Sequence, residues 1–127
     1  MAHFAIDYSA NLEPAVDWPA LCDLIRRAAI DTGVFPMAGI RVRAFRADHV
    51  SIADGNPDHG YIDISIRLRA GRTLEARKRA TADIFTAIET YLKPLMASRS
   101  VALSLEMRDI DADLAPKTGS IRDHLKG

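Results

Sequence analysis

The chain alternates hydrophobic and polar side chains in four stretches, each with the two-residue period of a half-buried β-strand. The first stretch covers residues 3–9, where Phe4, Ile6 and Tyr8 share one face. The clearest is "YIDISIRLR", in which aliphatic residues occupy every second position. The stretches "IRVRAFR" and "VALSLEMR" complete the set. We therefore expect four strands that each bury one side.

The segment after the first strand repeats its apolar residues at helical spacing. Asp17 is the candidate N-cap, Pro19 lies in the first turn, where its missing N–H costs nothing, and Gly33 follows the last periodic residue. The apolar stripe of this predicted helix consists of Trp18, Leu21, Cys22, Ile25, Ala28 and Ala29. Because Cys22 lies in this stripe, we interpret it as a small core residue and not as a nucleophile.

The segment after the third strand has a longer stripe of the same kind. Thr73 is its candidate N-cap, and Pro94 is expected to kink or shorten the end of the helix because proline lacks an N–H donor. The apolar face at helical spacing consists of Leu74, Thr81, Ile84, Phe85, Ile88, Leu92 and Leu95. The order strand, helix, strand thus occurs twice.

This repeated order predicts a duplicated βαβ fold of the α+β class. We expect one domain over residues 1–127, with pseudo-repeats at about 2–58 and 59–110 and a C-terminal tail, 111–127, on the surface. Right-handed crossovers would place both helices on one face of a four-stranded mixed sheet. The other face would then meet either solvent or, as we favour, symmetry mates in a cyclic oligomer. It would carry Asp63, Ser65, Arg67, Ala102, Ser104 and Glu106.

Composition narrows the class of protein further. Hydrophobic residues make up 48% of the chain, and the 17 basic residues equal the 17 acidic ones, which argues against nucleic acid or a membrane as a partner. The single cysteine excludes an internal disulfide, and the four histidines show no metal-ligand spacing. No signal-peptide pattern is present, and no apolar run approaches the roughly 18 residues of a membrane span. We expect a cytoplasmic protein.

Several irregular segments agree with one known family in order and spacing. They are "HFAIDYSANL", "TGVFPMAGIRVR", "ADG", "AGRTLEAR" and "MASRSVALSLEM". Over essentially the whole chain the sequence resembles the 5-carboxymethyl-2-hydroxymuconate delta-isomerase family of the tautomerase superfamily. The resemblance implies a homotrimer with sites near its subunit interfaces and no cofactor. It also implies a proton shift in an unsaturated keto dicarboxylic acid of the muconate type, 5-carboxymethyl-2-hydroxymuconate, in the breakdown of homoprotocatechuate.

The resemblance also implies roles for individual residues. Family members use an N-terminal proline amine, freed by removal of the initiator Met, as a general base, and Ala2 holds that position here. An α-amino group has a pKa of about 7.7–8.0, which burial and nearby cations lower, so it can be neutral and ready to accept a proton. Arg41 in "AGIRVR" and Arg72 in "AGRTLE" match the substrate-binding arginines, and His3 adjoins the base.

The alanine at position 2 leaves three hypotheses open. The chain is an isomerase that uses the Ala2 amine after Met1 is removed, or a related tautomerase of another enol or keto acid. Alternatively, it is a catalytically weak or silent trimeric homologue that binds anions through Arg41 and Arg72. If Met1 is retained, the nitrogen of Ala2 is an amide without a basic lone pair. The mass of the purified chain, which shows whether Met1 is present, therefore helps to distinguish these hypotheses.

Overall fold

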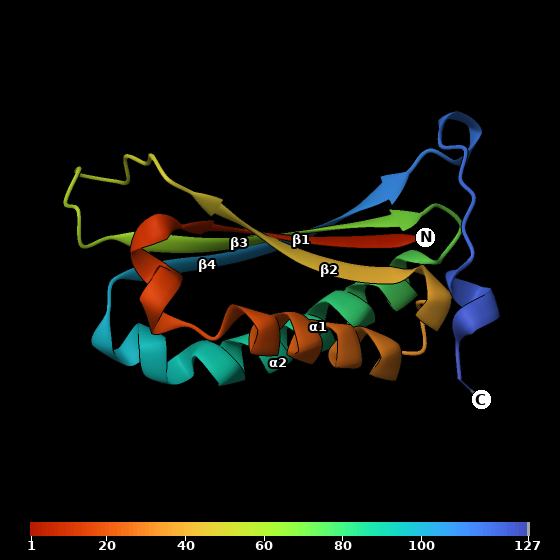
Figure 1. Cartoon of the computed structure of the whole chain (residues 1–127), viewed down its shortest axis with the longest axis horizontal. Helices are drawn as coiled ribbons and strands as arrows, with labels where there is room; N and C mark the ends of the chain where they lie inside the picture. The colour runs from red at the N-terminus through yellow and green to blue at the C-terminus, as the bar shows by residue number, and fades with distance from the viewer. Residues whose placement is uncertain (127) are drawn as a thin grey trace.

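The computed structural model describes residues 1–126 as a four-stranded sheet with two helices on one of its faces (Figure 1). Gly127, the last residue of the predicted tail, lies outside the described residues. The main elements are β1 (Ala2–Ser9), α1 (Trp18–Asp31), β2 (Ile40–Ala47), β3 (Gly60–Arg69), α2 (Leu74–Ser98) and β4 (Val101–Ile110). The short 3-10 helices are η1 (Ala10–Ala15), η2 (Met37–Gly39), η3 (Ala112–Leu114) and η4 (Ile121–His124). Within residues 1–126, no helix combines the length and apolar character needed to cross a membrane.

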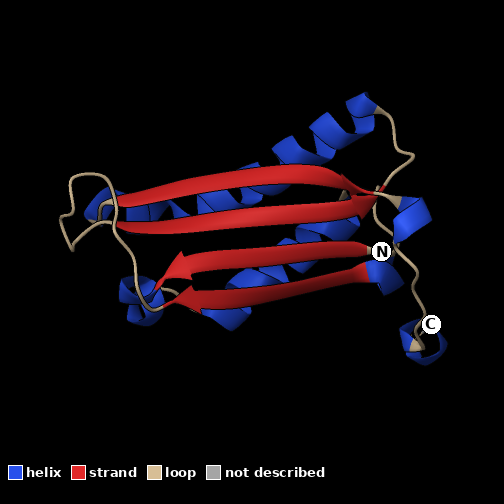
Figure 2. Ribbon diagram, turned by 90° about the horizontal axis from the view of Figure 1, so that it is seen from above, coloured by secondary structure: helices blue, strands red, loops and turns tan. Residues whose placement is uncertain are grey.

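The strands lie side by side in the order β2-β1-β3-β4 (Figure 2). β1 runs parallel to β2, β3 runs parallel to β4, and the central pair β1 and β3 is antiparallel. Each parallel pair together with its crossover helix is one βαβ unit, and the two units meet along β1 and β3. The predicted mixed sheet with both helices on one face is confirmed.

The core lies between the sheet and the helices. The inward-facing strand residues Phe4, Ile6 and Ile64 are completely buried, as are Ile25 of α1 and Ile84 of α2. These are positions that the two-residue and helical periods assigned to the inner faces. The alternation was a reliable guide because each strand buries one side only.

The predicted helix starts are confirmed in atomic detail. Asp17 Oδ1 accepts a hydrogen bond from the Ala20 N–H at 3.1 Å, and Thr73 Oγ1 accepts one from the Ala76 N–H at 3.1 Å. Gly33, which follows α1, has a φ of +73°, a left-handed conformation that favours glycine. Capping residues and the glycine stop therefore set the bounds of the helices.

Two details of the second helix differ from the prediction. Leu74 was expected on the buried stripe but is 54% exposed, because it faces an open hollow lined by residues of α2 and β4. Pro94 does not shorten the helix, which continues to Ser98. The Ser98 hydroxyl donates to the carbonyls of Pro94 and Leu95, and these bonds support the last turn.

The opposite face of the sheet has no helix over it (Figure 1). The polar residues predicted for this face are there, and some of them bind one another. The Tyr61 hydroxyl donates to Asp7 Oδ1 at 2.7 Å, and the Ser104 hydroxyl donates to Asp63 Oδ1 at 2.7 Å. One register row across this face consists of three arginines and a histidine: Arg41, His3, Arg67 and Arg108.

Candidate functional site

The start of the chain is held between two strands. Ala2 is completely buried and pairs with Ile40 of β2 and with Leu68 of β3. The Met1 carbonyl accepts a hydrogen bond from the Arg69 N–H at 3.4 Å. Chain ends usually fray because nothing buried depends on them. Here the sheet fixes the first residues, so the amine has a defined position.

Gly39 allows the N-terminus to approach β2 closely. A β-carbon built on Gly39 would lie 3.0 Å from the Met1 nitrogen, 3.2 Å from Met1 Cα and 3.7 Å from the Ala2 nitrogen. Any larger residue would therefore press on the first residue of the chain. Sequence reasoning placed the segment "MAGIRVR" in a family pattern but did not identify Gly39 as part of the site.

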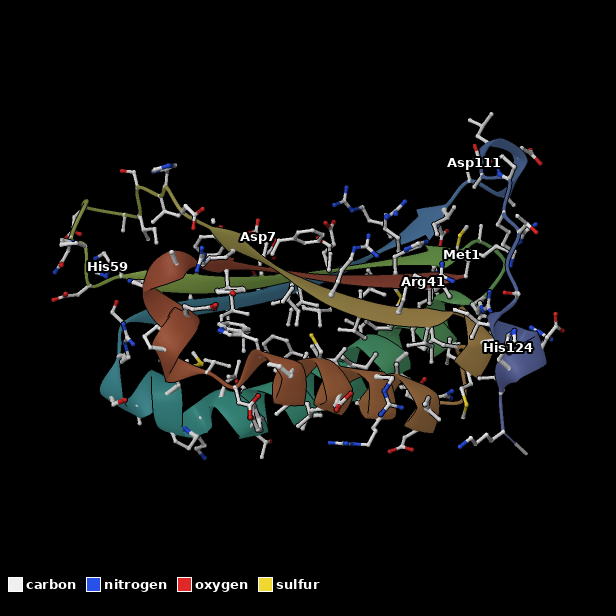
Figure 3. The ribbon with its side chains drawn as sticks, in the orientation of Figure 1. Met1, Asp7, Arg41, His59, Asp111 and His124 are labelled. Carbon is white, nitrogen blue, oxygen red and sulfur yellow. The ribbon has the colours of Figure 1, made fainter. Side chains whose placement is uncertain are left out.

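The amine opens into a cavity of about 230 Å³. Three stretches that are distant in sequence line it: Met1, the segment from Pro36 to Arg41, and part of the C-terminal tail. Figure 3 shows Met1, Arg41 and His124 of the tail at the same end of the molecule. The residues lining the cavity are Met1, Pro36, Ala38, Gly39, Arg41, Lys117, Thr118, Gly119, Ile121 and Arg122.

The surroundings of the amine favour its neutral form. Burial lowers the pKa of the Met1 amine below its usual value of 8.0, and the nearby Lys117 ammonium lowers it further. The charges of Arg72 and Arg41 act in the same direction. A neutral amine carries the lone pair that a general base needs. The site can thus accept a proton and bind an anion at the same place.

Arg72 lies near the amine without lining the cavity. It precedes Thr73, the N-cap of α2, and its Nη1 donates to the Arg69 carbonyl at 3.2 Å. That carbonyl belongs to the residue whose N–H binds Met1, so the same turn holds both the chain start and Arg72. The structure therefore places Arg72 close enough to influence the amine by charge.

His3 lies on the open face of the sheet and not in the cavity. Its ring nitrogens are 3.2 Å from Arg43 Nη1 and 3.5 Å from Arg41 Nη1. Burial lowers the pKa of His3, and the charges of Arg67, Arg41, Arg43 and the N-terminal amine lower it further. A neutral imidazole at this position can accept a hydrogen bond from a guanidinium group, which would help to orient Arg41.

The C-terminal tail contributes residues that sequence reasoning missed. The tail was predicted to be a surface segment, and it is exposed, but part of it also lines the cavity. Lys117 and Arg122 bring two further positive charges to the cavity. The stretch "APKTGSIRDHLKG" shows basic residues but no spacing that links them to the N-terminus, so no local signal identified them.

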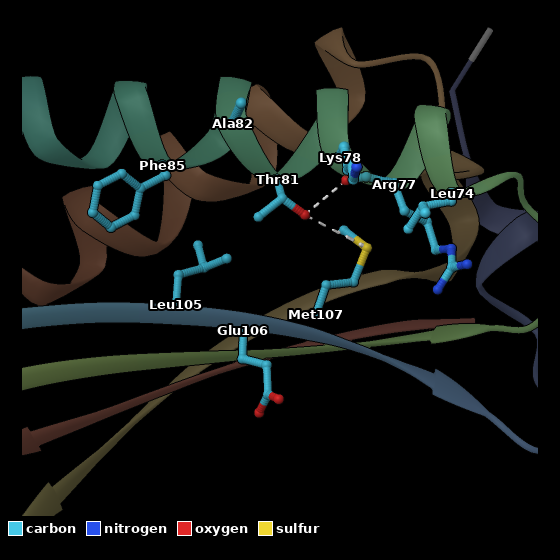
Figure 4. A pocket seen from close by; sticks show the side chains of 9 residues that line it. All are labelled: Leu74, Arg77, Lys78, Thr81, Ala82, Phe85, Leu105, Glu106 and Met107. Atoms are coloured by element: carbon cyan, nitrogen blue, oxygen red, sulfur yellow. Dashed lines mark hydrogen bonds between the residues drawn. The ribbon is translucent and has the colours of Figure 1, made fainter.

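A second hollow of about 540 Å³ lies between α2 and β4 (Figure 4). It is lined largely by apolar side chains such as Leu74, Phe85 and Leu105. The Thr81 hydroxyl donates to the Arg77 carbonyl at 2.7 Å inside it. Neither Met1 nor Arg41 belongs to this hollow, so it is separate from the amine. Among residues 1–126, no group of three or more His, Cys, Asp or Glu side chains is arranged to hold a metal ion.

The duplicated βαβ sheet, with an N-terminal amine that opens into a cationic cavity, has the architecture expected from the family resemblance of the sequence. Comparison with known sequences gives the family: the profile of the 5-carboxymethyl-2-hydroxymuconate isomerase family matches residues 2–125. The chain belongs to this family.

Individual relatives agree with that assignment. The chain is 35% identical over 121 residues to the 5-carboxymethyl-2-hydroxymuconate Delta-isomerase of Escherichia coli, covering 95% of this chain and 96% of the relative. A crystal structure of a 5-carboxymethyl-2-hydroxymuconate delta-isomerase superposes with a TM-score of 0.92 at 30% identity, covering 100% of this chain and 95% of the other. A fused 4-OT symmetric trimer shares the fold, with a TM-score of 0.58 at 23% identity and 85% coverage of both chains.

Proposed function

We propose that this chain is an isomerase that moves a proton within an unsaturated keto acid of the muconate type. The names of the family and of the E. coli relative support 5-carboxymethyl-2-hydroxymuconate as the substrate. The family resemblance further implies a role in the breakdown of homoprotocatechuate. One observation carries the proposal: Met1, whose amine has a lowered pKa, lines the same cavity as Arg41, and removal of Met1 would leave the amine of Ala2 beside that cavity. This combination provides a base and an anion-binding group within reach of one ligand.

The chemistry requires a base that takes up a proton and then returns it. The neutral amine removes a proton from one position of the substrate, which leaves an ammonium group and a dienolate. The guanidinium of Arg41 binds a carboxylate beside the reacting atoms and stabilises the negative charge that develops. The ammonium then delivers the proton to a different carbon, and the amine becomes neutral again. The proton count balances with no other reactant.

The base in this proposal is the Ala2 amine, freed by removal of Met1. Ala2 is the first residue of β1, and its nitrogen lies on the same side of Gly39 as the Met1 nitrogen. Met1 lines the cavity, so its removal enlarges the space for substrate. The primary amine of Ala2 lacks the ring of proline, which would fix the direction of the lone pair, and we expect a lower rate than with proline.

Arg72 and His3 support this centre in different ways. We assign Arg72 as a second substrate-binding cation, because it lies beside the amine and immediately before the N-terminus of α2, where backbone N–H groups also favour an anion. His3 acts through Arg41, which its ring contacts. Replacing His3 with phenylalanine should therefore raise KM more than it lowers kcat.

We further propose that the protein is a homotrimer. The sheet face opposite the helices is uncovered, and both β2 and β4 are edge strands with unpaired backbone groups. The related fused 4-OT trimer shows that this fold supports three-fold assembly. Light scattering during size-exclusion chromatography should give three times the chain mass of 14.0 kDa. A monomer at micromolar concentration would exclude the assembly.

Three measurements test the function. Intact-mass analysis should show that Met1 is absent. With a muconate-type substrate, Ala2→Pro should raise kcat, and Arg41→Ala should lower kcat/KM by about 10- to 100-fold. The matched control is Arg27→Ala, which removes an exposed arginine on α1 and should leave the kinetics unchanged. Retention of Met1, together with no gain from proline, would favour a silent anion-binding protein.

A further inference from the structure

Three cations line the cavity at the amine, and no acidic residue lines it. Arg41 comes from β2, whereas Lys117 and Arg122 come from the C-terminal segment 117–122. Within residues 1–126, none of the three forms an ion pair. Uncompensated like charges around one small cavity repel one another, and a bound anion relieves that repulsion. The number of cations exceeds what a single carboxylate requires.

The three cations lie on two parts of the molecule that are held in place by different hydrogen bonds. Arg41 is fixed in the sheet by the pairing of β1 and β2. The backbone hydrogen bonds within residues 112–126 are local, from Leu114 to Asp111, from Asp123 to Ser120 and from Leu125 to Arg122. Segment 117–122 is thus not a strand of the sheet, and its Lys117 and Arg122 line the cavity together with Arg41. A ligand with a carboxylate at each end would connect the sheet to the segment.

We propose that the segment 117–122 binds a second carboxylate of the substrate, remote from the one that Arg41 binds, and that Lys117 is the specificity-determining residue. This inference rests on the proposed isomerase function. It assigns residues to the second carboxylate of the muconate-type acid that the proposed function already names. The family name describes such a ligand, because a muconate has a carboxylate at each end and here bears a carboxymethyl group as well.

Lys117 has a second effect that the experiment must separate. Its charge also lowers the pKa of the amine, so replacing it changes the base as well as the carboxylate contact. The change in the base affects every substrate alike. The ratio of kcat/KM for two substrates that differ only in the second carboxylate is therefore insensitive to the base and reports the contact alone.

The experiment compares 2-hydroxymuconate with 2-hydroxypenta-2,4-dienoate, which has the same dienol and only one carboxylate. Lys117→Met should lower kcat/KM for the dicarboxylate by about 10- to 100-fold more than for the monocarboxylate. Arg122→Gln should likewise lower the ratio of kcat/KM for the dicarboxylate to kcat/KM for the monocarboxylate. The matched control is Lys126→Met, which removes a lysine of the same tail that does not line the cavity.

The outcomes distinguish this inference from the proposed function. If the unmodified protein turns over both acids and the ratio stays unchanged in Lys117→Met and Arg122→Gln, the inference is wrong and the isomerase function stands. If the unmodified protein turns over neither acid, the isomerase function fails, and calorimetric titration with adipate and hexanoate decides the inference. Tighter binding of adipate that is lost in Lys117→Met supports the second carboxylate site, and equal binding overturns it.

Discussion

Replacing Gly39 with alanine tests how the first residue of the chain is positioned. With Met1 in place, the added methyl carbon lies 3.0 Å from the Met1 nitrogen and 3.2 Å from Met1 Cα. Both distances are below the optimal separation of about 3.5–4.0 Å. Met1 must then move, although its carbonyl is bonded to the Arg69 N–H. Once Met1 is removed, the Ala2 nitrogen at 3.7 Å is the closest remaining contact, which is an ordinary distance.

Gly39→Ala is therefore expected to destabilise the form that retains Met1 and to stabilise the form from which Met1 has been removed. Forcing a methyl group into a packed site costs about 1–3 kcal/mol. Gly39 does not have a positive φ, so alanine fits its backbone, and restricting the unfolded chain stabilises the fold by about 0.4–1 kcal/mol. We expect a loss of about 1 kcal/mol with Met1 and a gain of about 0.5 kcal/mol without it. These values separate the two Tm shifts by roughly 5 °C.

The assay is thermal unfolding followed by circular dichroism at one protein concentration. Expression with an inhibitor of methionine aminopeptidase gives the form with Met1, and treatment with that enzyme gives the processed form. Intact mass confirms each form, and the unsubstituted protein in both forms is the control. Tm shifts of Gly39→Ala with the same sign and size in both forms would refute the close approach of Met1 to Gly39.

Three other expectations concern pH and the core. We expect the freed Ala2 amine to meet the burial and the cations that lower the pKa of the Met1 amine, so in the processed enzyme kcat/KM should rise with pH through a pKa below 8.0. Lys117→Met should move this limb to higher pH, and an unmoved limb would remove Lys117 from the surroundings of the base. Burial and the hydrogen bond to Glu13 raise the pKa of Tyr8 to about 12, so the stability that this phenol contributes is complete below about pH 10 and is lost as pH rises towards 12. Alkaline unfolding should be less steep in Tyr8→Phe. Ile64→Ala, at a completely buried position in β3, should cost about 2–5 kcal/mol in urea unfolding, and a cost below 1 kcal/mol would contradict its central place in the core.

Much of the fold follows from short-range patterns. The alternation in "YIDISIRLR" predicted β3 because its aliphatic side chains all face the helices and its polar ones face away. Asp17 and Thr73 marked the helix starts because a capping side chain must sit next to the backbone groups that it satisfies. Leu74 failed as a core position because periodicity gives the direction of a side chain but not whether neighbouring side chains fill the space around it.

The residues of the site could not be identified from short-range sequence patterns. Arg41 was identified from the family resemblance, and the structure places it in the cavity with the amine. Gly39 and Lys117 were missed because their importance comes from contacts with Met1, which is distant from both in sequence. Those contacts depend on the register of β1 against β2 and on the path of the chain after β4. Neither is encoded in the residues around Gly39 or Lys117 alone.

The cavity is lined by residues from both ends of the described chain, so its walls are complete only after the C-terminal tail has been synthesised. Met1 leaves the ribosome long before Lys117, and the segment 117–122 follows β4, the last strand to join the sheet. A nascent chain can therefore complete its first βαβ unit with an N-terminal amine but no tail cations beside it. A chain that stops or is cut after Ile110 would keep every strand and helix of the core and lose the wall that carries Lys117 and Arg122. The cavity at the amine therefore gains its tail wall only when translation reaches the end of the tail.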